Sequence, residues 1–71
     1  MEVRASYAFA GSFEIDAAAH SAAGRVSDFS GAGFGVRDLG WVCQSELEAE
    51  RIARALRKIG LQPEIRKGRP E

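Results

Sequence analysis

The chain has few of the residue types on which catalysis and metal binding most often depend. Among its 71 residues there is one cysteine, Cys43, and one histidine, His20. A single cysteine forms no internal disulfide, which predicts a reducing, cytoplasmic compartment. Zinc needs three or four ligands, so we expect no metal site. Cys43 falls on the predicted core face of a strand, where a thiol is protonated and inert. We therefore expect a protein that is not an enzyme and uses no cofactor.

Long hydrophobic runs are also missing. No apolar run approaches the roughly 18 residues that cross a membrane, so we expect no membrane partner. The first residues, MEVRASYAFAG, lack the basic segment and uninterrupted apolar stretch of a signal peptide. With 45% hydrophobic and 28% charged residues, the composition is globular. A chain of this length buries only about 60% of its unfolded surface. We predict one compact domain over residues 1–71, with a thin core and a frayed tail at 68–71.

The net charge is zero, but the charges are unevenly distributed. Residues 1–50 contain three basic and eight acidic residues, a net charge of −5, whereas residues 51–71 contain seven basic and two acidic ones, a net charge of +5. Acids at the start of a helix and bases at its end complement the helix dipole, which explains part of this asymmetry. The rest predicts a basic C-terminal patch for a partner with an acidic surface, protein or nucleic acid. Its residues are Arg54, Arg57, Lys58, Arg66 and Lys67.

The clearest local signal is a helix within residues 45–61. Ser45 and Glu48 have the spacing of a capping box, in which each side chain binds a backbone amide that the first turn leaves unpaired. Gly60 followed by Leu61 predicts a left-handed stop with a hydrophobic contact behind it. Apolar residues recur at helical spacing and predict one buried stripe made of Ala49, Ile52, Ala53, Leu56 and Ile59.

The N-terminal half begins with a predicted strand over residues 3–9. Its alternation places Val3, Ala5, Tyr7 and Phe9 on the core face and Arg4, Ser6, Ala8 and Ala10 on the other. A helix capped by Ser12 is predicted next, because an apolar stripe continues through Ile15, Ala19, Ala22, Val26 and Phe29. Three alanines at 17–19 favour this helix. The alternative is a hairpin turning at Gly11-Ser12, since Phe13 and Ile15 also continue the alternation of the strand.

The middle of the chain is glycine-rich and then strand-like. Alternation at Phe34 and Val36, and again at Trp41 and Cys43, predicts two strands joined by a hairpin turn at Asp38-Leu39-Gly40. A short last strand is predicted at 63–67. This order of strands and helices predicts a small α+β, ferredoxin-like sandwich with two helices on one face of a four-stranded antiparallel sheet. The alternative fold starts with a β-hairpin and has a single long helix.

One short motif resembles a known family. Gly33-Phe34-Gly35-Val36, followed by the predicted helix, is similar to the RNA-recognition motif, whose third strand carries aromatic side chains that stack on bases. The resemblance covers about twenty residues and implies RNA binding on the sheet. Because the hairpin predicted at 37–44 puts this motif on the second strand, the stacking residues of the family do not transfer to this chain. The string GAGFG also lacks the third, helix-opening glycine of a dinucleotide site.

The sheet face opposite the predicted core carries small, weakly polar groups, namely Arg4, Ser6, Ala8, Ala10, Val42 and Gln44. Such a flat surface suits a protein partner or a second copy of the chain. We therefore expect a non-catalytic protein-binding module: an adaptor, a homodimer, or a steric inhibitor of the anti-CRISPR type from a phage or mobile element. The alternative is RNA binding through the basic C-terminal patch. The candidate partner-binding residues are Arg4, Ser6, Ala8, Gln44, Arg54, Arg57, Lys58, Arg66 and Lys67.

Overall fold

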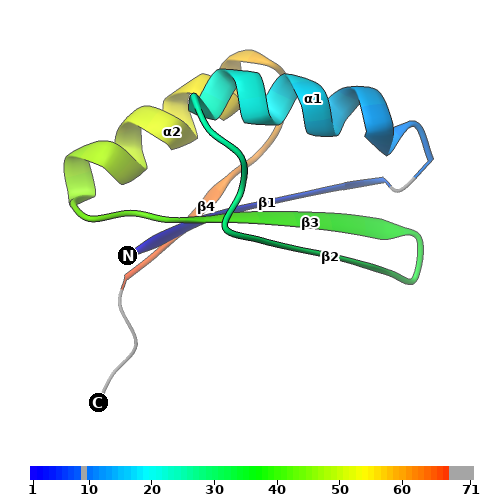
Figure 1. Ribbon diagram of the computed structural model, residues 1–71, viewed down its shortest axis with the longest axis horizontal. Helices are drawn as coiled ribbons and strands as arrows, with labels where there is room; N and C mark the ends of the chain where they lie inside the picture. The colour runs from blue at the N-terminus through cyan, green and yellow to red at the C-terminus, as the bar shows by residue number, and fades with distance from the viewer. Residues whose placement is uncertain (9, 68–71) are drawn as a thin grey trace.

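The computed structural model describes residues 1–8 and 10–67, and the side chain of Ser12 lies outside that description. The elements are β1 (Glu2–Ala8), α1 (Ser12–Ala23), β2 (Phe29–Gly33), β3 (Val36–Val42), α2 (Glu46–Lys58) and β4 (Glu64–Arg66). The strands form one antiparallel sheet in the order β2-β3-β1-β4, and both helices cover the same face of it (Figure 1). This is the predicted ferredoxin-like arrangement. The alternative with one long helix is wrong, because residues 12–23 form a helix.

Helix α1 ends earlier than its apolar spacing predicted. Gly24 adopts a left-handed conformation with φ 85° and donates its N–H to the carbonyls of His20 and Ser21, which stops the helix. Phe29 therefore begins β2 and does not extend the helical stripe. The residue at the N-terminal cap position is Gly11, with φ 78°, and not Ser12 as predicted. The predictions for Phe9 and for the tail at 68–71 lie outside the described residues.

Helix α2 has the predicted boundaries, the predicted Ser45 cap and the predicted glycine stop, whereas the Glu48 side chain binds the amide before the cap residue. Ser45 Oγ accepts the N–H of Glu48 at 3.1 Å, and Glu48 Oε1 accepts the N–H of Gln44 at 2.9 Å. At the other end, Leu61 donates its N–H to the carbonyl of Leu56 at 3.1 Å, which closes the left-handed stop. Four of the five residues in the predicted stripe are buried, namely Ala49, Ile52, Ala53 and Leu56, whereas Ile59 is 41% exposed.

The hairpin between β2 and β3 turns at Phe34-Gly35, so the prediction of a turn at residues 38–40 is wrong. Both turn residues have positive φ, 54° at Phe34 and 77° at Gly35, as a two-residue type I′ turn requires. Residues 38–40 lie inside β3 and pair with β1. Gly40 is needed there for space and not for a turn, because a Cβ atom at this position would lie 2.1 Å from the ring of Phe29.

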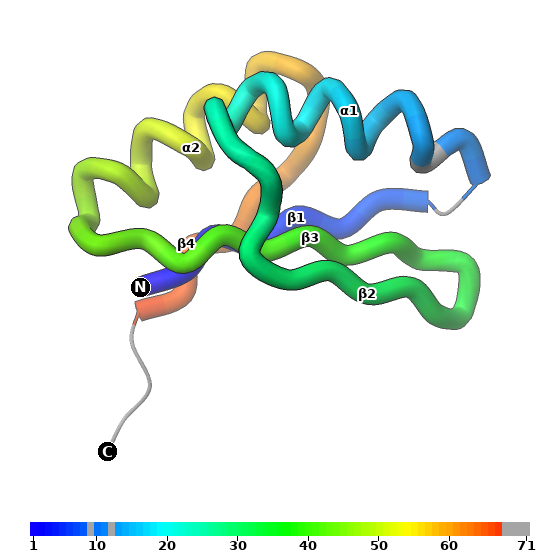
Figure 2. Tube along the Cα trace, in the orientation of Figure 1, coloured from blue at the N-terminus to red at the C-terminus, as the bar shows by residue number. Residues whose placement is uncertain are grey.

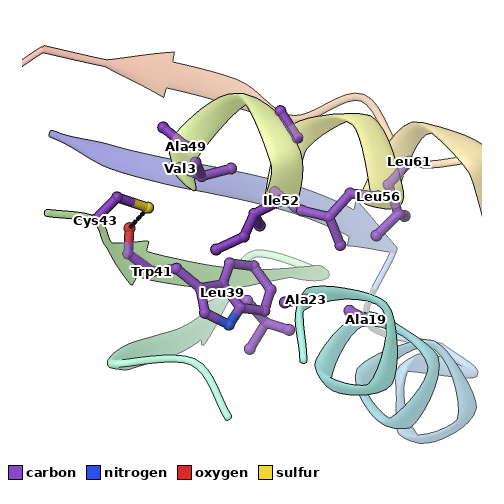
Figure 3. Packing of buried hydrophobic residues seen from close by; sticks show 12 residues of the cluster. Val3, Ala19, Ala23, Leu39, Trp41, Cys43, Ala49, Ile52, Leu56 and Leu61 are labelled. Atoms are coloured by element: carbon purple, nitrogen blue, oxygen red, sulfur yellow. Dashed lines mark hydrogen bonds between the residues drawn. The ribbon is translucent and has the colours of Figure 1, made fainter. Parts of the chain in front are cut away.

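The core lies between the sheet and the helices and is built around Trp41 (Figure 3). Its indole N–H donates to the carbonyl of Arg25 at 3.1 Å, and the ring of His20 meets it edge-on with ring centroids 6.1 Å apart. The small side chains of Ala19 and Ala23 face this core from α1. Leu39 is buried on the same strand, β3, which ends at Val42, and Cys43 is buried directly after that end. The burial of Trp41 and Cys43 and the exposure of Val42 and Gln44 confirm the predicted alternation of 41–44. Neither helix is long and apolar enough to cross a membrane within the described chain.

Candidate interaction surfaces

The two helices leave the second face of the sheet uncovered (Figure 2), and we call it the open face. Val3 and Ala5 are buried under the helices, so the predicted set of Arg4, Ser6 and Ala8 lies on the open face. Residues paired across neighbouring strands share a face, which extends the set to the other strands. The additional members are Glu2, Phe29, Gly31, Gly33, Val36, Asp38, Gly40, Val42, Glu64 and Arg66.

Among the described residues, one end of the open face carries few large side chains outside the hairpin turn. Ala8 pairs with Val36, and Val36 pairs with Gly33, so these three form one row across the sheet. Phe34 follows in the turn and is fully exposed, and Val36 is 40% exposed. We call Ala8, Gly33, Phe34 and Val36 the hairpin patch. The first turn of α1, which carries the exposed Phe13, lies at the same end of the molecule (Figure 1).

The centre of the open face holds one aromatic ring. Phe29 lies over Gly40, and the guanidinium carbon of Arg4 stands 4.9 Å from the ring centroid, within reach of a cation–π contact. Arg4 Nε also donates to Glu2 Oε1 at 2.9 Å. The Ser6 hydroxyl donates to the carboxylate of Asp38. The polar side chains Arg4 and Ser6 are therefore already paired with acidic side chains of the same face.

Gln44 lies beyond the end of β3, outside the sheet. It borders a hollow of ≈ 380 Å³ together with Arg25, Asp28, Val42 and Glu48. Arg25 Nη1 donates to Asp28 Oδ2 at 2.9 Å, and the N–H of Val42 donates to the same oxygen at 2.6 Å. These two bonds lower the pKa of Asp28 below its ordinary value. Gln44 thus belongs to the junction between β3 and α2 and not to the flat open face.

The predicted basic C-terminal patch is two separate surfaces. Arg54, Arg57 and Lys58 are exposed on α2, and no ion pair within residues 1–8 and 10–67 involves them. Strand β4 runs back from the end of α2 toward the N-terminus (Figure 1), where Arg66 pairs with Glu2 across the sheet. Arg66 therefore lies on the open face, where its Nε contacts Glu64 Oε1 at 2.6 Å, and Lys67 follows it.

The outer side of α2 adds two residues that sequence reasoning did not select. Leu47, 80% exposed, and Arg51 line a shallow hollow of ≈ 610 Å³ along this helix, together with Arg54 and Lys58. Phe29, Phe34 and Val36 were also missed as surface residues. The sequence did contain a signal for the exposure of Phe34, because a phenylalanine between two glycines has no neighbouring side chains in the chain to cover it.

The residues that were considered for catalysis have separate structural partners. His20 Nε2 lies 3.3 Å from Ser27 Oγ, and the Cys43 thiol donates to the carbonyl of Trp41 at 3.8 Å. Burial raises the pKa of the Cys43 thiol, which keeps it protonated. Among the described residues there is no group of three or more His, Cys, Asp or Glu side chains that could hold a metal ion.

A second polar cluster joins β1, β3 and α1. The Tyr7 hydroxyl donates to the carboxylate of Asp16, and Arg37 Nη2 contacts the same group at 3.0 Å. Burial by itself raises the pKa of Asp16, but the hydrogen bonds from Tyr7 and Arg37 outweigh it, and the pKa lies below its ordinary value. Burial, followed by the bond to Asp16, raises the pKa of Tyr7. This cluster fastens α1 to the sheet.

The likeness to the RNA-recognition motif can now be judged on geometry. Strand β3 runs without a second hairpin into α2, so the predicted insertion at 37–44 is wrong, and the motif lies at the β2–β3 turn and the start of β3. However, the central strands β1 and β3 present Arg4, Ser6, Val36, Asp38 and Gly40 to the open face, and no described residue of these two strands presents an aromatic ring there. Base stacking on the central strands is therefore not supported.

Comparisons with protein-family models, with curated proteins and with solved structures give no match for this chain.

Proposed function

We propose that the chain is a non-catalytic protein-binding module that docks through the hairpin patch at one end of the open face. The observation that carries this proposal is Phe34. Its side chain is fully exposed and its backbone is left-handed, with φ 54°. That conformation costs an L-residue about 1–2 kcal/mol and is adopted most readily by glycine and asparagine. A large apolar residue that adds nothing to the core, at a position that disfavours it, is typical of a binding site.

The charges on the open face favour a protein over a nucleic acid. The face carries three acids, Glu2, Asp38 and Glu64, against two bases, Arg4 and Arg66. Both arginines contact a neighbouring glutamate. A phosphate backbone would meet an excess of negative charge here, whereas an apolar protein surface would meet small side chains and Phe34. Binding that covers part of a partner's surface needs no reactive group, so this mode of action suits an adaptor or a steric inhibitor of the anti-CRISPR type.

The test compares the same substitution on two faces. A tagged chain captures its partner, the partner is identified and purified, and its dissociation constant is measured by calorimetry for the wild type, Ala8→Arg and Ala18→Arg. Ala8 is exposed on the open face, and Ala18 is exposed on α1 in the opposite layer. We expect Ala8→Arg to weaken binding by about tenfold or more, equivalent to about 1.4 kcal/mol, and Ala18→Arg to leave it unchanged. Weakening by Ala18→Arg alone would contradict the proposal.

A second candidate is nucleic-acid binding by the outer side of α2. The observation that favours it is a group of cations without an ion pair among the described residues, namely Arg51, Arg54, Arg57 and Lys58. Binding that neutralises several phosphates weakens steeply with salt, whereas an apolar protein contact does not. The combined change Arg54→Glu, Arg57→Glu and Lys58→Glu should abolish such binding. Retention of RNA binding by this triple variant would exclude α2 as the nucleic-acid site.

A further inference from the structure

Strand β2 is a sheet edge without the usual protection against pairing. It pairs only with β3, and its residues Ser30, Gly31, Ala32 and Gly33 are all exposed. An edge strand presents unpaired N–H and C=O groups to other strands, and natural proteins block such edges with charges, proline, bulges or very short strands. The five residues of β2, FSGAG, contain neither a charged residue nor proline.

The opposite edge of the same sheet shows what protection looks like. Strand β4 has only three residues, two of which are the charged Glu64 and Arg66, and Pro63 directly precedes it. Each of these features discourages another strand from pairing. The sheet therefore has one closed edge and one open edge, and the open edge is the longer of the two.

The turn determines which backbone groups of β2 point outward. Gly33 and Val36 flank a two-residue turn and form the first hydrogen-bonded pair of the hairpin. Hydrogen-bonded and non-hydrogen-bonded pairs alternate along an antiparallel ladder, so Gly31 also bonds toward β3. The N–H and C=O groups of Ser30 and Ala32 consequently face away from the sheet. They are spaced to pair with the same two residues of an identical strand running in the opposite direction.

We infer that two copies of the chain pair through β2, antiparallel and centred on Gly31, to form a continuous eight-stranded sheet. Ser30 of each copy lies opposite Ala32 of the other and exchanges two backbone hydrogen bonds with it. The two Gly31 residues face each other across the twofold axis, and no charged side chain of either strand opposes another. A second copy of the chain matches this edge because a twofold contact uses the same groups on both sides, here the backbone N–H and C=O of Ser30 and Ala32.

The proposed dimer edge and the hairpin patch share Gly33, so the two proposals are tested at other residues, Gly31 and Ala8. Ala8 lies on β1, which is separated from β2 by β3. Ala8→Arg should therefore weaken partner binding and leave the dimer intact, whereas substitutions at Gly31 should do the reverse. The failure of one proposal is in this way distinguishable from the failure of the other.

The first test uses charge at the axis. A Cβ atom at Gly31 meets no atom within 4 Å, and the residue has no left-handed backbone, so the monomer tolerates a side chain there. Light scattering with size exclusion at millimolar concentration should give the wild type twice the 7.7 kDa of one chain. Gly31→Lys and Gly31→Glu should each give one chain, because like charges directly opposite repel. An equimolar mixture of both variants should restore the double mass.

The second test traps the predicted register. In a non-hydrogen-bonded antiparallel pair the Cα atoms lie about 4.5 Å apart, inside the range of about 4.4–6.8 Å that a disulfide accepts. Gly31→Cys should form a covalent dimer on mild oxidation at micromolar concentration, and Ala17→Cys, exposed on α1, serves as the control. Equal, slow cross-linking of the two variants, with a monomeric wild type at millimolar concentration, would overturn the inference and leave β2 available to a strand of another protein.

Discussion

Replacement of Phe34 by asparagine should stabilise the fold, although it removes a large apolar side chain. The Phe34 side chain is fully exposed, so its loss exposes no core surface. Its φ of 54° costs an L-residue about 1–2 kcal/mol, and asparagine tolerates this region much better at a type I′ turn. We expect Phe34→Asn to raise the free energy of unfolding by about 1 kcal/mol, a shift of about 4–8 °C in Tm for a domain of this size.

The assay is urea unfolding at micromolar concentration, followed by the fluorescence of Trp41, the only tryptophan, which is fully buried. Phe13→Asn is the matched control, because Phe13 is 86% exposed but lies on helix α1. Phenylalanine and asparagine have similar helix propensities, so the control should change stability by less than about 0.5 kcal/mol. An unchanged or lowered free energy of unfolding for Phe34→Asn would refute the reasoning.

Three further predictions concern the fold. Tyr7→Phe should lower the free energy of unfolding by about 1.5–3 kcal/mol near neutral pH, because it removes a hydrogen bond to the charged Asp16. Because the pKa of Asp16 is lowered in the folded state, this stabilisation is present above the ordinary pKa of 3.8 and is lost as pH falls through the folded-state pKa. Urea unfolding of the wild type and the variant at neutral pH and at a pH below 3.8 would show the difference between them shrink. Ser45→Ala should cost about 1 kcal/mol by removing the α2 cap, measured by thermal unfolding. Gly40→Ala should cost about 1–3 kcal/mol through its clash with Phe29, and equal costs with and without Phe29→Ala would contradict this account.

Local signals predicted the helices better than the hairpin. At α2 the serine cap and the glycine stop both lie within a few residues of the helix they delimit, and the structure confirms both. The Glu48 side chain of the predicted capping box binds the N–H of Gln44 and not that of Ser45. The hairpin turn was predicted at Asp38-Leu39-Gly40, because the glycine of this short segment can adopt a positive φ. In the structure, Gly40 leaves the space that the ring of Phe29 occupies, and Phe29 lies eleven positions earlier in the chain. The real turn, Phe34-Gly35, lacks the asparagine or aspartate that marks such turns in a sequence.

The candidate surfaces were predictable only where they follow strand alternation. Because side chains alternate between the two faces of a strand, the sequence correctly predicted that Arg4, Ser6 and Ala8 share the open face. The basic C-terminal patch was predicted from proximity in sequence, and the reversal of direction at β4 carries Arg66 away from Arg57. The open edge of β2 could not be predicted either, because glycine, alanine and serine are not typical strand residues. That strand depends on its pairing with β3.

The measurement that tests the central claim most directly is an NMR titration of the chain with its purified partner. Docking at the hairpin patch predicts that the methyl signals of Val36 and the ring signals of Phe34 shift or broaden on addition of the partner. The methyl signals of Leu47, exposed on the outer side of α2, should stay in place. Shifts confined to Leu47, with Val36 and Phe34 unchanged, would contradict the account and place the partner on α2.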